Sequence, residues 1–223
     1  MPYKGHTLER VPEKTTVNTD SLDCTTFVET VMALGKTIGE QRDSWRDFVA
    51  NLTSIRYRGG EVNGYPSRLH YISDWTVDNG HRDNFREVTA TLPKVKYVTK
   101  TIDFMSRHRD SYPALADSLN YERIRSVEEG YHLHRFPYIK SNDLNNKLVK
   151  AELKNGDVVA FVSNLTDLDV THMGMLIKEA DGEFHVLHAS LNGGQVMISD
   201  LPLGEFMRRN RHFSGIRVYR LLQ

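Results

Sequence analysis

The sequence has few of the features that mark membrane, disulfide-rich or nucleic-acid-binding proteins. It contains one cysteine in 223 residues, which excludes an internal disulfide and a cysteine-rich zinc site. It has no run of about 18 apolar residues, so we expect no membrane span. Lysine plus arginine and aspartate plus glutamate both total 29. This balance gives no reason to expect a nucleic acid or a membrane surface as a partner.

The chain also shows no signal peptide, because Met1–His6 lacks an apolar core segment. No internal repeat or low-complexity linker divides it. The hydrophobic share of 39% with 26% charged residues is that of an ordinary globular domain. We therefore expect one domain over residues 1–223, acting as a monomer.

The apolar pattern changes from helical in the first half to alternating in the last third. Helical spacing covers four segments: 24–34, 42–55, 66–75 and 114–129. Strands are expected at 156–162, 172–177, 184–188, 195–198 and 215–222, with a short helix at 203–209. Turn residues at 181–182 and 192–194 favour an antiparallel meander. The predicted fold class is α+β, in which a largely helical insertion, about 40–150, separates an N-terminal helix from a C-terminal antiparallel sheet.

Cys24 is the most informative residue, since cap-type residues place it at the start of the first predicted helix. A helix N-terminus favours a thiolate. His172 and His188 lie far downstream on short apolar segments, and an early cysteine with late histidines is typical of a thiol hydrolase. The alternative stays open, because Cys24, Phe27 and Val28 also fit the buried face of a helix.

The two histidines offer a base and a residue that orients it. Adjacent antiparallel strands would bring His172 and His188 together, and an imidazole base needs a polar partner on its other nitrogen. The same pair is a potential zinc site. The sequence has no suitably spaced carboxylate and no His-Glu-x-x-His helix, so we expect neither a metal nor another cofactor.

Several short segments resemble one known family. Asp23–Val28 is similar to the Asp-Cys-Ser-Gly-Phe-Val signature of the NlpC/protein-60 superfamily of papain-like peptidoglycan hydrolases. Segments 156–161, 172–175 and 187–190 resemble that family's histidine-bearing strands, and Pro2–Gly5 resembles its Pro-Tyr element. Thr25 and Thr26 replace the usual Ser-Gly. This replacement, and segments 68–75 and 104–108, resemble one branch of the superfamily. Members of that branch have a large helical insertion, and the branch was formerly catalogued as a domain of unknown function.

The resemblance implies a cysteine amidase that cleaves the N-acetylmuramoyl-L-alanine bond of small muropeptides in cell-wall recycling or turnover. Cys24 would be the nucleophile, His172 the base and His188 its orienter, with Tyr3 as an oxyanion donor. The substrate-binding residues would be Asp23, Thr25, Arg68, His70, Asp74 and Trp75. Asp23 is equally suited to cap the helix, and Trp75 is equally suited to the core.

Two other functions remain open from the sequence. The commoner superfamily activity is cleavage after γ-D-glutamate in the stem peptide, although the changed residues beside Cys24 argue against it. An inactive cell-wall binding module on the same fold is the other alternative. The substrate class leads us to expect a periplasmic or otherwise exported protein.

Overall fold

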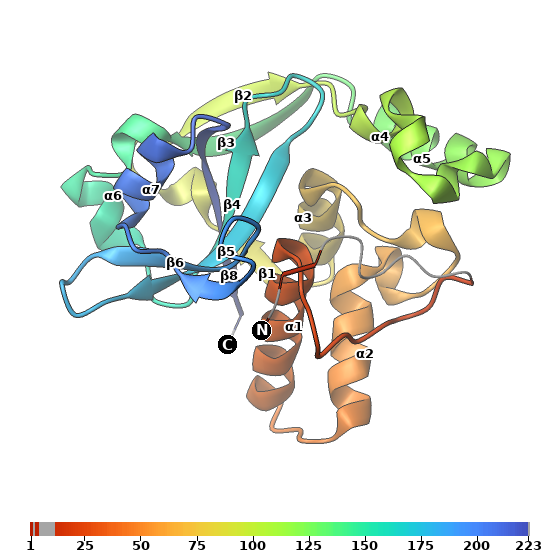
Figure 1. Ribbon diagram of the computed structural model, residues 1–223, viewed down its shortest axis with the longest axis horizontal. Helices are drawn as coiled ribbons and strands as arrows, with labels where there is room; N and C mark the ends of the chain where they lie inside the picture. Colours follow the sequence, from red (N-terminus) through yellow and green to blue (C-terminus); the bar gives the residue numbers. More distant parts are fainter. Residues whose placement is uncertain (2, 5–11, 223) are drawn as a thin grey trace.

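The computed structural model describes residues 1, 3–4 and 12–222 of the chain (Figure 1). The first half holds α1 (Cys24–Gly39), α2 (Trp45–Arg56), α3 (Ile72–His81), β1 (Phe85–Glu87), β2 (Lys96–Lys100), α4 (Phe104–Arg107) and α5 (Ser118–Glu129). The second half holds β3 (His134–Lys140), α6 (Lys147–Glu152), β4 (Val158–Ser163), β5 (Val170–Lys178), β6 (Phe184–Ser190), β7 (Gln195–Ile198), α7 (Leu203–Arg209) and β8 (Phe213–Leu221).

The strands form one antiparallel sheet. Its order is β2-β3-β8-β4-β5-β6-β7, and the short β1 pairs with β8. The turns at 181–182 and 192–194 connect β5, β6 and β7 as a meander. The predicted α+β class, with α1 packed on an antiparallel sheet, is confirmed.

The segment between α1 and the C-terminal strands adds more than helices. Strands β1, β2 and β3 come from this segment and extend the same sheet. Only α4, α5 and their neighbouring short helices stand apart from the sheet, at one end of the molecule in Figure 1, around a small core of their own. The insertion is joined to the sheet through β1–β8 and β3–β8 pairing, and β2 pairs with β3.

The sheet has an apolar core on each face. The first core contains α1, α2 and α3 residues with inward residues of β4 and β5. The second lies under α6 and α7 and contains Val159, Phe161, Leu176 and Val218. Strand β4 is buried along its whole length, because both of its faces are covered. Among the described residues, no helix combines the length and apolarity needed to cross a membrane.

Candidate active site

Helix α1 begins at Cys24 because Asp23 caps it. The Asp23 carboxylate accepts a hydrogen bond from the Thr26 N–H at 2.8 Å, and the Asp23 N–H donates to the Thr26 hydroxyl at 2.9 Å. This reciprocal capping box satisfies first-turn donors and fixes the helix start. The sequence placed Cys24 in the first helical turn, and the structure has it there. The capping role of Asp23, one of its two predicted roles, is therefore present.

The Cys24 thiol faces strand β5. Backbone groups of Met173 and Thr25 hydrogen-bond to the thiol, and the Thr25 hydroxyl lies 4.0 Å from its sulfur. Met173 is available for this contact because the β5–β6 ladder begins only at Met175. Strand separation at the end of β5 thus makes room for the start of α1.

The electrostatics of the thiol differ from the sequence-based expectation. Burial raises the pKa of Cys24 to about 11, and the neighbouring Asp23 carboxylate adds to the rise. The two backbone hydrogen bonds lower it only in part. A helix start favours a thiolate, but here the desolvation of the thiol outweighs that effect. A reaction at this thiol requires a base.

His172 and His188 form a close pair next to the thiol-binding residue Met173. His172 Nε2 lies 2.7 Å from His188 Nδ1. Burial lowers the pKa of His172 to about 3, with a smaller contribution from His188, and burial also lowers the pKa of His188. Both rings are therefore neutral at neutral pH. In the tautomer in which His172 Nε2–H donates to His188 Nδ1, the His172 Nδ1 atom carries no proton and is the nitrogen that can accept one.

No hydrogen bond joins Cys24 to His172 among the described residues. The two are related through β5, since the Met173 backbone acts on the thiol and His172 is the preceding residue of the strand. Apo sites often hold such pairs loosely, and the contact tightens when a substrate is bound.

Tyr3 approaches the same thiol from the N-terminal segment. Its N–H donates to the Gly194 carbonyl at 2.7 Å, and Tyr3 bridges to Leu22 just before α1. Burial raises the pKa of the Tyr3 phenol, with further contributions from Cys24 and Asp23. These charges act on Tyr3 only because it is close to them. The rest of the family-like Pro2–Gly5 element, except Lys4, lies outside the described residues.

Arg68 and His70 form a second group that is held by internal partners. Arg68 Nη2 donates to Glu13 at 2.9 Å, and the His70 ring nitrogen Nε2 lies 3.1 Å from the Tyr65 carbonyl oxygen. Burial, followed by the Arg68 charge, lowers the pKa of His70 to about 3. Both Asp23 and Arg68 influence the pKa of the buried Glu29, so Arg68 lies toward the start of α1. Substrate contacts by Arg68 and His70 stay a prediction.

The structure corrects the expectation for Asp74 and Trp75. The Asp74 carboxylate is buried and takes two hydrogen bonds from Arg58, at 2.8 and 2.6 Å, and one from Tyr131 at 3.0 Å. Trp75 is 1% exposed and packs on Phe85, with ring centroids 4.2 Å apart. Neither offers a free surface to a substrate, because the helix turn that was read as a cleft wall faces the core.

Sequence reasoning missed two contributors to this site. The contact of the Met173 backbone with the thiol does not depend on the Met173 side chain, so no residue pattern in the sequence predicts it. It becomes visible only in the structure, where the β5–β6 ladder stops. Glu13 joins Arg68 and the Tyr57 hydroxyl, the latter at 2.8 Å, and a lone glutamate in a polar segment has no distinctive pattern. Among the described residues, no group of three or more histidine, cysteine or acidic side chains is arranged to hold a metal.

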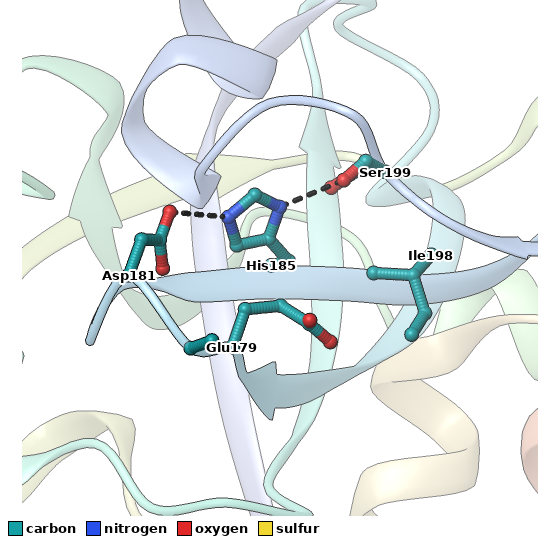
Figure 2. A pocket seen from close by; sticks show the side chains of 6 residues that line it. Glu179, Asp181, His185, Ile198 and Ser199 are labelled. Atoms are coloured by element: carbon teal, nitrogen blue, oxygen red, sulfur yellow. Dashed lines mark hydrogen bonds and ion pairs between the residues drawn. The ribbon is translucent and has the colours of Figure 1, made fainter.

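A pocket on the β5–β6 hairpin is lined by His185 (Figure 2). His185 Nδ1 lies 2.7 Å from the Ser199 carbonyl oxygen and Nε2 lies 3.1 Å from Asp181. Burial lowers the pKa of His185, but these two acceptors outweigh it and the net pKa is raised. His185 thus connects the hairpin turn to the residue that follows β7. His172 and His188 are not part of this contact, because they hydrogen-bond to each other.

Comparison with known proteins finds a matching family and several similar solved structures. A family model described as AmiA-like, N-acetylmuramoyl-L-alanine amidase-like, matches residues 1–216. An N-acetylmuramoyl-L-alanine amidase from Bacteroides uniformis has 35% identity and a TM-score of 0.92, covering 100% of this chain and 93% of that chain. A protein from Bacteroides fragilis, provisionally named a xylanase, has 34% identity and a TM-score of 0.91, covering 99% and 96%.

A more distant Legionella pneumophila protein shares the fold, with 22% identity, a TM-score of 0.75 and coverage of 100% and 84%. The search of curated proteins found no match. The resemblance of the short motifs to the NlpC/protein-60 superfamily stays a prediction. The match over nearly the whole sequence shows that the chain belongs to the N-acetylmuramoyl-L-alanine amidase-like family.

Proposed function

We propose that this protein is a cysteine amidase that hydrolyses the bond between N-acetylmuramic acid and L-alanine in small muropeptides. The observation that carries the proposal is the Cys24 thiol bound to the Met173 backbone, one residue from the paired imidazole of His172. Family membership supports an amide substrate. The thiol and imidazoles are the groups that acyl transfer requires.

The pKa values indicate how the proton moves. The pKa of Cys24 lies near 11 and that of His172 near 3, so a thiolate–imidazolium pair is not the resting state. The proton passes to His172 Nδ1 as the sulfur attacks the carbonyl carbon. When the carbon–nitrogen bond breaks, His172 returns the proton to the leaving amino group of L-alanine. Water then cleaves the thioester, with His172 again as the base, and releases the sugar acid.

Two donors are available for the developing oxyanion. The N–H of Cys24 opens helix α1 and has no acceptor among the described residues. The Tyr3 hydroxyl, close enough for Cys24 to affect its pKa, is the second candidate. His188 holds His172 through Nε2 and would stabilise the imidazolium that forms.

The name of the Bacteroides fragilis relative suggests hydrolysis of a glycosidic bond, but this site supports that activity less well. Hydrolysis of a glycosidic bond generally needs two carboxylates on opposite sides of the sugar. The carboxylate nearest the thiol, Asp23, is engaged in capping α1. The inactive binding module, the other alternative, would retain a cleft but would not need the His172–His188 hydrogen bond.

The test is turnover of a purified muropeptide, followed by mass spectrometry. The wild type should release a muramyl sugar and a peptide with a free L-alanine terminus. Cys24→Ala and His172→Ala should abolish release, whereas His185→Ala, which removes a histidine of the same hairpin, should keep it. Turnover by Cys24→Ala would remove the thiol from the mechanism. A product in which the sugar remains on L-alanine would favour the endopeptidase.

A further inference from the structure

Three phenylalanine rings from separate elements meet at the histidine pair. Phe161 of β4 lies 5.5 Å from the His172 ring, centroid to centroid, and is inclined by 29°. Phe213 of β8 lies 6.1 Å from the same ring and is nearly parallel, at 7°. Phe206 of α7 stands edge-on to His188, at 5.3 Å and 76°. Each imidazole therefore contacts at least one of these rings.

The three rings also contact one another. Phe161 lies 4.9 Å from Phe213 and 5.5 Å from Phe206, between ring centroids. Phe161 is completely buried, whereas Phe206 and Phe213 are half-buried. We call Phe161, Phe206 and Phe213 the aromatic wall. It forms a continuous apolar surface behind the histidines, with one member anchored in the core.

Strand register explains why the wall forms at this point. Phe161 is paired directly with His172 in the β4–β5 ladder, so both side chains emerge on one face of the sheet. The register of β4 shifts against β5 just after Phe161, and against β8 one residue later. Such irregularities re-aim the residues beyond them. Phe213, opposite Ser163, lies beyond the second shift and packs on Phe161.

We propose that Phe206 and Phe213 are positioning residues, which hold His172 and His188 in the planes that keep His172 Nε2 on His188 and Nδ1 available to Cys24. This inference rests on the proposed function for the role of His172. A single hydrogen bond, 2.7 Å long, allows the two rings to rotate about it. Contact with flat aromatic faces removes that freedom and excludes water from the two rings.

The test compares Phe206→Leu and Phe213→Leu with Phe184→Leu. Phe184 is a buried residue of β6 in the same core, and it has no ring contact with either histidine among the described residues. The wall variants should lose about tenfold or more in kcat with KM within about twofold, because small misplacement of a catalytic group has large effects on rate. The acidic limb of their pH profile should move to higher pH. Phe184→Leu should change neither, even where it loses similar thermal stability.

A ring-preserving variant and a measurement without turnover complete the test. Phe213→Tyr keeps the aromatic face, and its hydroxyl can reach solvent at this half-buried position, so kcat should recover to within about threefold of wild type. Imidazole NMR titration of the same variants in the Cys24→Ala background reports on ring environment without catalysis. A shift in the wall variants but not in Phe184→Leu supports positioning even if Cys24 is not the nucleophile. Identical behaviour of Phe213→Leu and Phe184→Leu in both measurements would overturn the proposal.

Discussion

At the scale of single residues, the site depends on how Asp23 serves two neighbours at once. Its carboxylate caps α1 through Thr26, and the same charge raises the pKa of the adjacent Cys24 beyond the effect of burial. Capping requires only an oxygen acceptor, whereas the effect on Cys24 requires the negative charge. The two roles can therefore be separated by one substitution.

We expect Asp23→Asn to preserve the helix and to make the thiol more reactive. Asparagine is as good an N-cap as aspartate, so the free energy of unfolding should change by less than about 1 kcal/mol. Removing the charge should lower the pKa of Cys24, which raises the thiolate fraction at a fixed pH. The second-order rate of alkylation by iodoacetamide at pH 8.5 should rise several-fold. Asp20→Asn, at an exposed carboxylate on the same segment, is the control; equal rates in both variants would contradict the role of Asp23.

At the scale of elements, α1 is fixed to α2 by a buried ion pair. Arg56 Nε lies 2.6 Å from Glu29 Oε2, with the two side chains 1% and 3% exposed. Arg56 also donates to the Thr16 carbonyl at 2.6 Å, so the N-terminal segment joins the same contact. Burial raises the pKa of Glu29, and the Arg56 charge opposes that rise. Arg56 thus offsets part of the cost of burying the Glu29 carboxylate.

Arg56→Met should destabilise the protein by about 3–5 kcal/mol, because it leaves Glu29 buried without its partner. Glu29→Met with Arg56→Met should be less destabilised than Arg56→Met alone, since two apolar side chains then pack together. Urea unfolding of both variants measures the difference. Arg42→Met, which breaks the exposed pair with Asp47, should shift the urea midpoint far less than Arg56→Met does. If the double variant is less stable than Arg56→Met, the prediction is wrong. The Glu29–Arg56 pair would then contribute more to the free energy of unfolding than each charge gains by neutralising the other.

The same scale shows what the sequence could predict. Strand β7 and helix α7 have the predicted limits, because turn residues and a strong apolar period mark both. The sequence predicts a first helix over 24–34, but α1 continues through Gly35 to Gly39. Gly35 lies inside the helix where a Cβ would approach Leu221 at 3.1 Å, so close packing explains this glycine. Strand β3 was missed because it contains Pro137, which argues against a strand.

At the scale of the whole molecule, the active site joins segments that periodicity alone cannot bring together. Local pattern placed Cys24 on a helix start and the histidines on strands. No local pattern marks where the β5–β6 ladder stops, at Met175. The resemblance to a known family predicts that these segments share one site. It did not supply the burial of Trp75, because a buried and an exposed tryptophan give the same sequence signal.

Burial of neutral histidines gives the whole molecule a pH-dependent stability. Burial lowers the pKa values of His70 and His172 to about 3, and it also lowers those of His134 and His188. In the unfolded chain a histidine has a pKa of about 6.5. Below that pH the unfolded state binds more protons than the folded state, so stability must fall as the pH decreases from about 6.5 toward 3. The deeply buried His70 and His172 each contribute up to about 1.4 kcal/mol per pH unit.

His70→Gln isolates one of these groups outside the proposed catalytic residues. Glutamine keeps an N–H donor for the Tyr65 carbonyl but cannot titrate. The variant should therefore lose less thermal stability than wild type between pH 6.5 and pH 4, when the midpoint of unfolding is followed by circular dichroism. His81→Gln, at the exposed end of α3, serves as the control and should follow the wild-type curve. If His70→Gln also follows that curve, protonation of His70 does not drive acid unfolding, and other groups must account for it.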